Sequence, residues 1–262
     1  MTGRILLTAI AAAGALYAQK VPSEASESLT SERAEYTVTA EVVGPGVFQF
    51  ESGILAELGS AMRVIHAPAP LFRLGLTRNL EVRAGGDGAV WHPGDADCHA
   101  GLTDMVLEVK WKLRAEGHYL PGLALLPSVS LPAGRSGYTS AAYDPMVKLA
   151  LSKSLPAGFR VSSNLNIASL TDDGVRHQSR AASLCFEHDL ARGLVMYWES
   201  YRIWQFEAAA SPQTAWNTGI FRAVGRNAQV DLEVARVFQS VTPHWCLGAG
   251  LVLRGPRPLW RR

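Results

Sequence analysis

The chain has 262 residues, enough for one large or two ordinary domains, and its formal net charge of +2 gives no electrostatic case for nucleic-acid binding. Charged residues make up 18% of the sequence, below the roughly 25% of an average soluble domain. This deficit fits a protein whose outer surface does not lie entirely in water. No uncharged apolar run reaches the roughly 20 residues of a membrane-spanning helix, which excludes an α-helical membrane protein.

The first residues have the features of a secretion signal. Arg4 supplies a positive charge, residues 5–16 form a short apolar run, and Ala18 is a small residue before a cleavage site. The run is too short to span a bilayer. The sequence therefore predicts a signal peptide over residues 1–18, with a buried N-terminal helix as the alternative.

Apolar and polar residues alternate with a period of two along most of the chain. The segment 105–114, MVLEVKWKLR, is the clearest case. Successive side chains of a strand point to opposite faces, so this pattern builds one apolar and one charged face. About a dozen strands are predicted, and regular strands without helices between them indicate an all-β sandwich or barrel. The predicted strands are 46–58, 62–76, 79–90, 102–115, 121–132, 144–155, 159–170, 179–190, 193–205, 214–224, 228–238 and 244–254.

The predicted connections alternate in length. Tight turns are expected at 77–79, 156–158, 191–193 and 225–227, and longer polar loops at about 85–100, 133–143, 171–178 and 206–213. Short turns at one end and long loops at the other are typical of outer-membrane barrels, whose short turns lie in the periplasm. We therefore predict an all-β fold, a closed antiparallel up-and-down transmembrane β-barrel of about 12 strands over residues 46–254. Residues 19–45 form a polar arm that could plug the lumen, and residues 255–262 form a basic periplasmic tail.

The two faces of each strand can be assigned. The strands are about ten residues long, which suits a tilted membrane strand better than a soluble one, so the apolar face is expected to contact lipid. The polar face then lines the lumen, where it could bind a solute or set ion selectivity; structural ion pairs that close a narrow barrel are the alternative. The candidate lumen-lining residues are Gln49, Glu51, Glu81, Arg83, Glu108, Lys110, Lys112, Arg114, Lys148, Arg160, Asn164, Asn166, Glu187, Asp231 and Glu233.

Six segments, in this order and spacing, resemble the family "putative MetA-pathway of phenol degradation", a set of Gram-negative outer-membrane barrel transporters. They are 42–53 (VVGPGVFQFESG), 75–83 (GLTRNLEVR), 101–112 (GLTDMVLEVKWK), 125–134 (LLPSVSLPAG), 155–159 (LPAGF) and 248–251 (GAGL). The resemblance runs from about residue 31 to 254. It implies an outer-membrane, porin-like channel or transporter for small, often aromatic or hydrophobic, molecules.

Other chemistry is weakly represented. The loop 92–99 (HPGDADCH) contains metal-ligating residue types, but its spacing matches neither a zinc nor a calcium motif, so no metal or cofactor is predicted. Ser183, His177 and His188 are present without a nucleophile-elbow motif, so no enzyme is predicted. A barrel enzyme acting on lipid, a non-transporting structural barrel and a soluble secreted β-protein are the alternatives.

The predicted location is the outer membrane of a Gram-negative bacterium. The predicted partners are the lipid bilayer with its lipopolysaccharide, the outer-membrane assembly machinery and a small-molecule substrate that the sequence does not identify.

Overall fold

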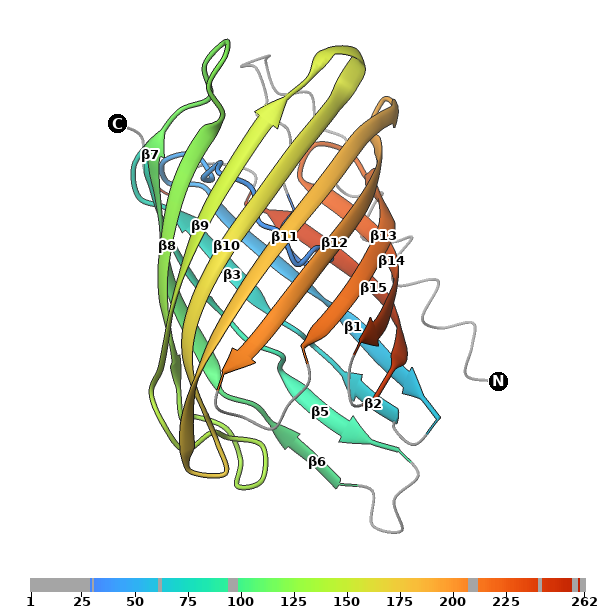
Figure 1. Ribbon diagram of the computed structural model, residues 1–262. Helices are drawn as coiled ribbons and strands as arrows, with labels where there is room; N and C mark the ends of the chain where they lie inside the picture. The colour runs from blue at the N-terminus through green and yellow to red at the C-terminus, as the bar shows by residue number, and fades with distance from the viewer. Residues whose placement is uncertain are drawn as a thin grey trace.

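The computed structural model describes residues 29, 31–60, 63–93, 99–206, 212–239, 242–255 and 259. Within these ranges the chain forms one antiparallel sheet that closes on itself, because the last strand pairs with the first (Figure 1). The strands are β1 Phe48–Gly59, β2 Arg63–His66, β3 Leu71–Gly75, β4 Leu80–Gly85, β5 Ala89–His92, β6 His99–Leu102, β7 Met105–Arg114, β8 Gly122–Leu131, β9 Asp144–Ser154, β10 Phe159–Asp172, β11 Val175–Ala191, β12 Leu194–Phe206, β13 Gln213–Ala223, β14 Ala228–Gln239 and β15 His244–Arg254. A single 3-10 turn, Pro156–Gly158, joins β9 to β10.

These segments make twelve barrel strands, as predicted. Strands β2 and β3 both pair with β1 and share one barrel position. Strands β4 and β5 share the next barrel position, because β4 pairs with β3 and β5 pairs with β2. Strands β6 and β7 share the position after that, because β6 pairs with β5 and β7 pairs with β4. Three of the twelve barrel strands are thus interrupted once each, which accounts for the fifteen segments.

The interruption in the second barrel strand falls at residues 67–70, which read Ala-Pro-Ala-Pro. Proline has no N–H to donate to a ladder, so regular pairing stops there. The two N–H groups that remain in this segment find partners across the break: Ala69 N donates to Gly53 O (3.1 Å) and Ala67 N to Ala89 O (2.9 Å). Gly88 lies opposite, and a Cβ there would overlap the Pro68 carbonyl oxygen. The regular ladder is therefore interrupted here while both backbone donors stay paired.

The two ends of the barrel differ. One end, called the turn end, carries the short connections 76–79, 155–158, 192–193 and 224–227, together with residues 115–121. Gly158, Gly193 and Gly225 have positive φ in these turns, a conformation that costs glycine little. The opposite end, called the loop end, carries residues 132–143 and the connections around 93–98, 207–212 and 240–243.

Two predicted loops are wrong. The loop at about 85–100 contains β5 and the start of β6. Residues 171–178 are not a long loop, because β10 continues to Asp172 and β11 starts at Val175. Asp173 and Gly174 both have positive φ and form a two-residue hairpin turn. The polar residues of this segment belong to a long hairpin rather than to an irregular connection, so polarity alone did not distinguish the two.

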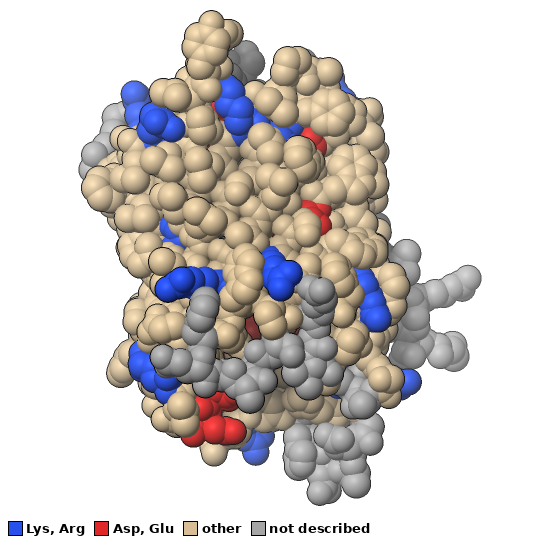
Figure 2. Space-filling model, in the orientation of Figure 1, with Lys and Arg blue, Asp and Glu red and all other residues tan. Residues whose placement is uncertain are grey.

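The outer face of the barrel is apolar. On β7 the alternate apolar residues from Met105 to Leu113 are all exposed, with Val109 38% and Trp111 52% accessible, whereas Lys110 between them is 0% accessible. On the face seen in Figure 2, a broad zone in the upper half is largely uncharged, with Lys and Arg near the top and in a row across the middle. Exposed apolar side chains recur on β1, β9, β10, β11, β13, β14 and β15, for example Ile54, Val147, Ile167, Phe186, Ile220, Leu232 and Leu247. Such a continuous apolar surface far exceeds the patches that soluble monomers expose, so it is suited to lipid. Among the described residues, no helix is long and apolar enough to cross a membrane.

Candidate functional site: the lumen and its arm

The candidate site is the barrel lumen, and it contains the segment of residues 31–43, called here the arm. Figure 1 shows the arm in dark blue within the ring of strands. Its residues Ala34, Thr37, Val38, Ala40 and Val43 are all buried. Because they precede β1 and lie inside a closed sheet, their burial comes from contact with the inner wall.

The arm contacts the inner face of every one of the twelve barrel strands. The wall residues involved, one or two for each strand, are Glu51, Arg73, Glu81, Lys110, Ala124 with Leu126, Ser152, Asn164, Ser183, Glu199, Asn217, Asp231 and Gly250. The arm therefore follows the circumference of the lumen rather than resting on one side of it.

Side chains of the wall satisfy the backbone of the arm. Glu199 accepts from the backbone N–H groups of Tyr36 (2.9 Å) and Thr37 (2.5 Å). The Asn164 amide accepts from Val38 N and donates to Val38 O, both at 2.8 Å, as a strand neighbour would. Further backbone groups of residues 32, 34, 40 and 43 bond to wall side chains. A buried non-strand segment needs such partners, because an unpaired buried N–H or C=O is costly.

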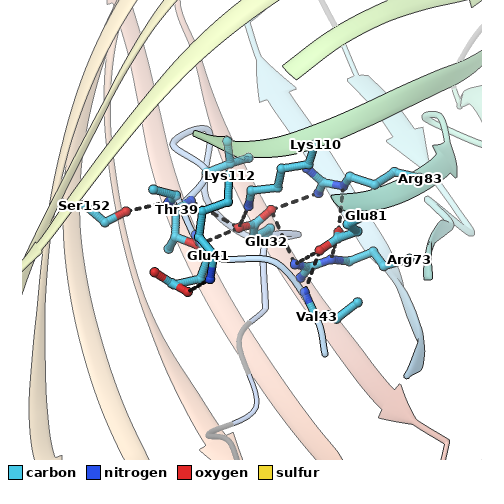
Figure 3. A network of polar contacts seen from close by, with 12 residues as sticks. Glu32, Thr39, Glu41, Val43, Arg73, Glu81, Arg83, Lys110, Lys112 and Ser152 are labelled. Carbon is cyan, nitrogen blue, oxygen red and sulfur yellow. Dashed lines mark hydrogen bonds and ion pairs between the residues drawn. The ribbon is translucent and has the colours of Figure 1, made fainter. Parts of the chain in front are cut away.

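Glu32 binds the basic part of the wall (Figure 3). Its carboxylate lies 2.6 Å from Lys110 Nζ and 3.0 Å from an Arg83 nitrogen, and its Oε2 lies 3.8 Å from Arg73. The side chains of Glu32, Arg73 and Lys110 are all inaccessible to solvent. Thr39 Oγ1 and N both donate to Glu32 Oε1, at 2.8 and 3.1 Å, so the same carboxylate also closes residues 32–39 into a loop.

The basic part of the wall is itself balanced by wall carboxylates. Arg73 donates to Glu51 (2.9 Å) and Glu81 (2.7 Å), and Arg83 donates to Glu108 (2.7 Å). Lys112, nearer the turn end, pairs with Glu41 of the arm at 2.9 Å. These charges are hydrogen-bonded as well as paired, which is the condition under which buried ions are tolerated.

Arg33 binds a second, acidic part of the wall, which is formed by β14. Its guanidinium donates to Asp231 and lies 3.8 Å from Glu233, both on β14. Gly53 and Gly250 lie beneath it, and a Cβ at either position would overlap the guanidinium. Glu32 and Arg33 are neighbours in the arm, and each contacts a wall region whose charge is opposite to its own. This complementarity fixes the orientation of the arm within the barrel.

The fifteen residues predicted to line the lumen are distributed as follows. Gln49, Glu51, Glu81, Arg83, Lys110, Asn164, Asn166, Glu187 and Asp231 are buried on the inner face. Glu108, Lys112, Lys148, Arg160 and Glu233 also lie on the inner face, at the positions that alternate with the exposed apolar ones. Arg160 pairs with Glu187 at 2.5 Å, towards the turn end. Arg114 is exposed instead and donates to Pro121 O, because the β7–β8 register shifts between Lys112 and Arg114.

Sequence reasoning missed several wall residues that hold the arm. Arg73 is fully buried and pairs with Glu51 and Glu81, yet it was overlooked in the short segment between Phe72 and Leu74. Successive side chains of a strand point to opposite faces, so the apolar neighbours of Arg73 on the lipid face indicate that Arg73 faces the lumen. Glu199 and Tyr197 were missed because β12 carries aromatic residues on both faces, so its sequence shows no clear alternation. Asn217, on the neighbouring β13, bonds Tyr197 and was missed as well.

The residues considered for lipid hydrolysis are separated by the fold. Ser183 faces the lumen, where its Oγ accepts from Thr37 Oγ1 at 2.8 Å. His188 lies on the opposite face of β11 and stacks on Phe159, with ring centroids 4.0 Å apart. His177 faces inward but is six residues from Ser183, about 20 Å along an extended strand. No serine–histidine pair forms from these three residues.

The predicted signal peptide lies outside the described residues, as do most of the loop 92–99 and most of the predicted tail 255–262. Among the residues that are described, no group of three His, Cys, Asp or Glu side chains is placed to hold a metal ion. Leu259 N, in the tail, donates to Gly46 O at 2.7 Å.

A closed antiparallel barrel with an apolar exterior and a polar lumen defines the class of outer-membrane β-barrels. The family model described as "Putative MetA-pathway of phenol degradation" matches residues 31–255, and the chain belongs to this family, as the sequence segments indicated. The matched region begins with the arm, so the arm is part of what the family model describes.

Solved structures share the fold. The COG4313 outer membrane channel from Pseudomonas putida F1 is 13% identical, with a TM-score of 0.64 over 86% of this chain and 100% of that chain. The KdgM porin in complex with disordered oligogalacturonate is 8% identical, with a TM-score of 0.53 over 79% of this chain and 98% of that chain. No curated protein sequence matches this chain significantly.

Proposed function

We propose that this protein is an outer-membrane channel for small molecules whose lumen is narrowed by the arm. The observation that carries the proposal is the arm itself: it contacts all twelve strands, ten of them through polar side chains, inside a barrel whose outer face is apolar. A barrel that served only to anchor the chain in lipid would not require charged side chains of both signs along its inner wall.

The comparisons support this class of function. The protein from Pseudomonas putida F1 is described as an outer membrane channel, and the KdgM porin was solved with a sugar oligomer. The family description refers to phenol degradation, which favours small aromatic or hydrophobic solutes. In this proposal the fourteen predicted residues that lie on the inner face determine which solutes enter, and the arm acts as a plug.

The proposal includes a location and partners. The protein is exported through the signal peptide at residues 1–18, is inserted by the outer-membrane assembly machinery and lies among phospholipid and lipopolysaccharide. Residues 19–45 form the arm region, residues 46–254 the barrel, and residues 255–262 a basic tail in the periplasm. The loop end then faces outward, since short turns are periplasmic in such barrels. The protein has no catalytic role in this proposal.

The test is reconstitution of the purified full chain in planar lipid bilayers. We expect single-channel conductance in KCl, and a larger conductance when Glu32→Gln and Arg33→Gln are combined, because the arm then loses its charged contacts with both wall regions. If neither protein conducts or admits small solutes into vesicles, the barrel is not a channel. Hydrolysis of lipid analogues by the wild type, lost in His188→Ala, would favour the enzyme alternative.

A further inference from the structure

Lys148 differs from the other lumen cations in its environment. Arg33, Arg73, Arg83, Lys110, Lys112 and Arg160 each form an ion pair with a carboxylate. Lys148 lies on the inner face of β9, and no carboxylate among the described residues lies within 4.0 Å of its ammonium group. Glu108 is the carboxylate whose charge acts most strongly on it, and Glu108 is already bonded to Arg83.

Lys148 lies on the loop-end side of the arm. On β9 the arm bonds to Ser152, and Lys148 is two inward-facing positions further towards the loop end. On β10 the arm bonds to Asn164, and Asn166 is the next inward position in the same direction. In the proposed orientation, Lys148 lies on the outer side of the arm's contact with Ser152, and Asn166 lies where Tyr36 of the arm reaches the wall.

Asn166 supplies a second unsatisfied polar atom beside Lys148. The two residues are direct partners in the β9–β10 register, so their Cβ atoms lie within about 5.5 Å of each other. The Asn166 amide nitrogen donates to Tyr36 Oη (3.2 Å), whereas its Oδ1 is buried without a hydrogen bond in the described structure. Exchanging the amide oxygen and nitrogen satisfies the same contact and leaves the nitrogen unpaired instead. Either orientation leaves one buried polar atom of Asn166 without a hydrogen-bond partner in the described structure.

Aromatic and apolar side chains lie next to these polar groups. Tyr36 of the arm stacks on Tyr201 of β12, with ring centroids 4.3 Å apart and an interplanar angle of 15°. Tyr201 also packs against an apolar cluster of inward-facing residues on β13, β14 and β15. The members of this cluster are Ala215, Ala235, Val237 and Cys246, with Leu55 packed against it. On the loop-end side of the arm, one side of the lumen thus carries Lys148 and the Asn166 amide, and the other side carries apolar and aromatic side chains.

We propose that Lys148 and Asn166 bind the carboxylate end of a small aromatic acid, whose ring packs towards Tyr201. A carboxylate satisfies an unpaired ammonium by a charge-assisted hydrogen bond, and its second oxygen accepts from the Asn166 amide nitrogen in the exchanged orientation, in which Oδ1 accepts from Tyr36 Oη. A ring gains from the tyrosine stack and the apolar cluster. An inorganic anion would use only the first contact, and a neutral aromatic only the second. The inference rests on the proposed channel function and names the class of solute that binds in the lumen on the loop-end side of the arm.

The experiment titrates benzoate against the purified full chain by calorimetry and, separately, as a blocker of KCl conductance. Acetate and benzyl alcohol are the probes that each lack one half of the ligand. We expect benzoate to bind more tightly than both, and Lys148→Met to weaken benzoate about tenfold while leaving benzyl alcohol unchanged. Lys148→Arg should restore most of the affinity. The matched control is Lys153→Met, on the same strand, whose side chain bonds Glu116 at the turn end.

Four outcomes separate the possibilities. Unchanged benzoate affinity in a folded Lys148→Met protein overturns the site, as does acetate binding as tightly as benzoate. Conductance without Lys148-dependent benzoate binding overturns the site and leaves the channel function standing. Lys148-dependent binding without any conductance or solute uptake overturns the channel function and leaves the site standing. The heat-dependent gel shift of each variant establishes that it is folded.

Discussion

The outer and inner faces of β7 show two ways in which one strand is stabilised. On the outer face, Leu107, Val109 and Trp111 are exposed and make few specific contacts. On the inner face, Lys110 is fully buried and bonds a carboxylate that comes from the arm, 78 residues away in the sequence. The outer residues need only be apolar, whereas the inner residue needs a particular partner.

This difference extends around the barrel. The lipid-facing side chains are interchangeable in principle, because the free energy gained in a bilayer depends on their apolar area and not on their shape. The lumen-facing side chains form a connected set in which Glu32, Arg73, Glu81 and Arg83 share partners. Removing one member leaves another charge without compensation. Substitutions on the two faces should therefore fail in different ways.

The largest effect is expected for Glu32→Gln on the inner face. It leaves Lys110 as a buried cation without its carboxylate, and breaking a buried pair costs about 3–5 kcal/mol, a figure that water entering the lumen would reduce. The arm should then leave the wall while the barrel remains closed. Trypsin cleavage after Arg33 measures this directly, and it should become fast in Glu32→Gln. Adding Lys110→Met should slow cleavage again, because it removes the uncompensated charge.

The next effect is expected for Val109→Arg on the outer face. An arginine facing lipid near the midplane costs about 2–4 kcal/mol in membrane barrels. Urea titration of folding into lipid vesicles should show a lower midpoint, with the folded form detected by its gel mobility. The matched control is Lys110→Arg, which places the same residue one position away on the inner face. A loss in Lys110→Arg as large as in Val109→Arg would mean that the two faces are assigned wrongly.

A smaller effect is expected for Gly250→Ala, which adds one methyl group to the lumen wall. The three nearest atoms to that Cβ all belong to the Arg33 guanidinium. Arg33 must shift and weaken its bond to Asp231, at about 1–3 kcal/mol of arm binding. In an Arg33→Ala background the same substitution should cost little, so the two changes should be strongly non-additive in urea unfolding. Additive losses would show that Gly250 is needed for another reason.

Much of the barrel was predictable from sequence because lipid imposes a simple rule. Alternation on β7, β8, β10 and β14 predicts both the strands and their outward faces. The rule fails on β12, where Tyr197 and Tyr201 face the lumen and Trp198 faces outward, so both faces are aromatic. It also gave one continuous strand over 62–76, although the Ala-Pro-Ala-Pro sequence at 67–70 carries a local signal for the interruption.

The placement of the arm could not be derived in the same way. Its sequence is polar and weakly patterned, because its partners are not neighbours in a ladder but side chains spread over most of the chain. Arg33 bonds Asp231, 198 residues later, and Thr37 bonds Glu199, 162 residues later. Contacts between residues so far apart in the sequence produce no local periodicity. Composition indicated an arm, and only the closed fold shows which wall residue each arm residue meets.

The smallest effect is expected for Lys112→Ala, two positions from Lys110 on the same inner face. Its pair with Glu41 is as short as 2.9 Å, yet the Glu41 side chain is 44% accessible, so water screens the pair. Such exposed pairs contribute about 0–1 kcal/mol, and trypsin cleavage after Arg33 should barely change. The comparison with Lys110→Met then separates two explanations of arm binding. If the summed charge of the basic wall holds the arm, the two substitutions act alike; if the buried contact with Glu32 holds it, only Lys110→Met releases the arm.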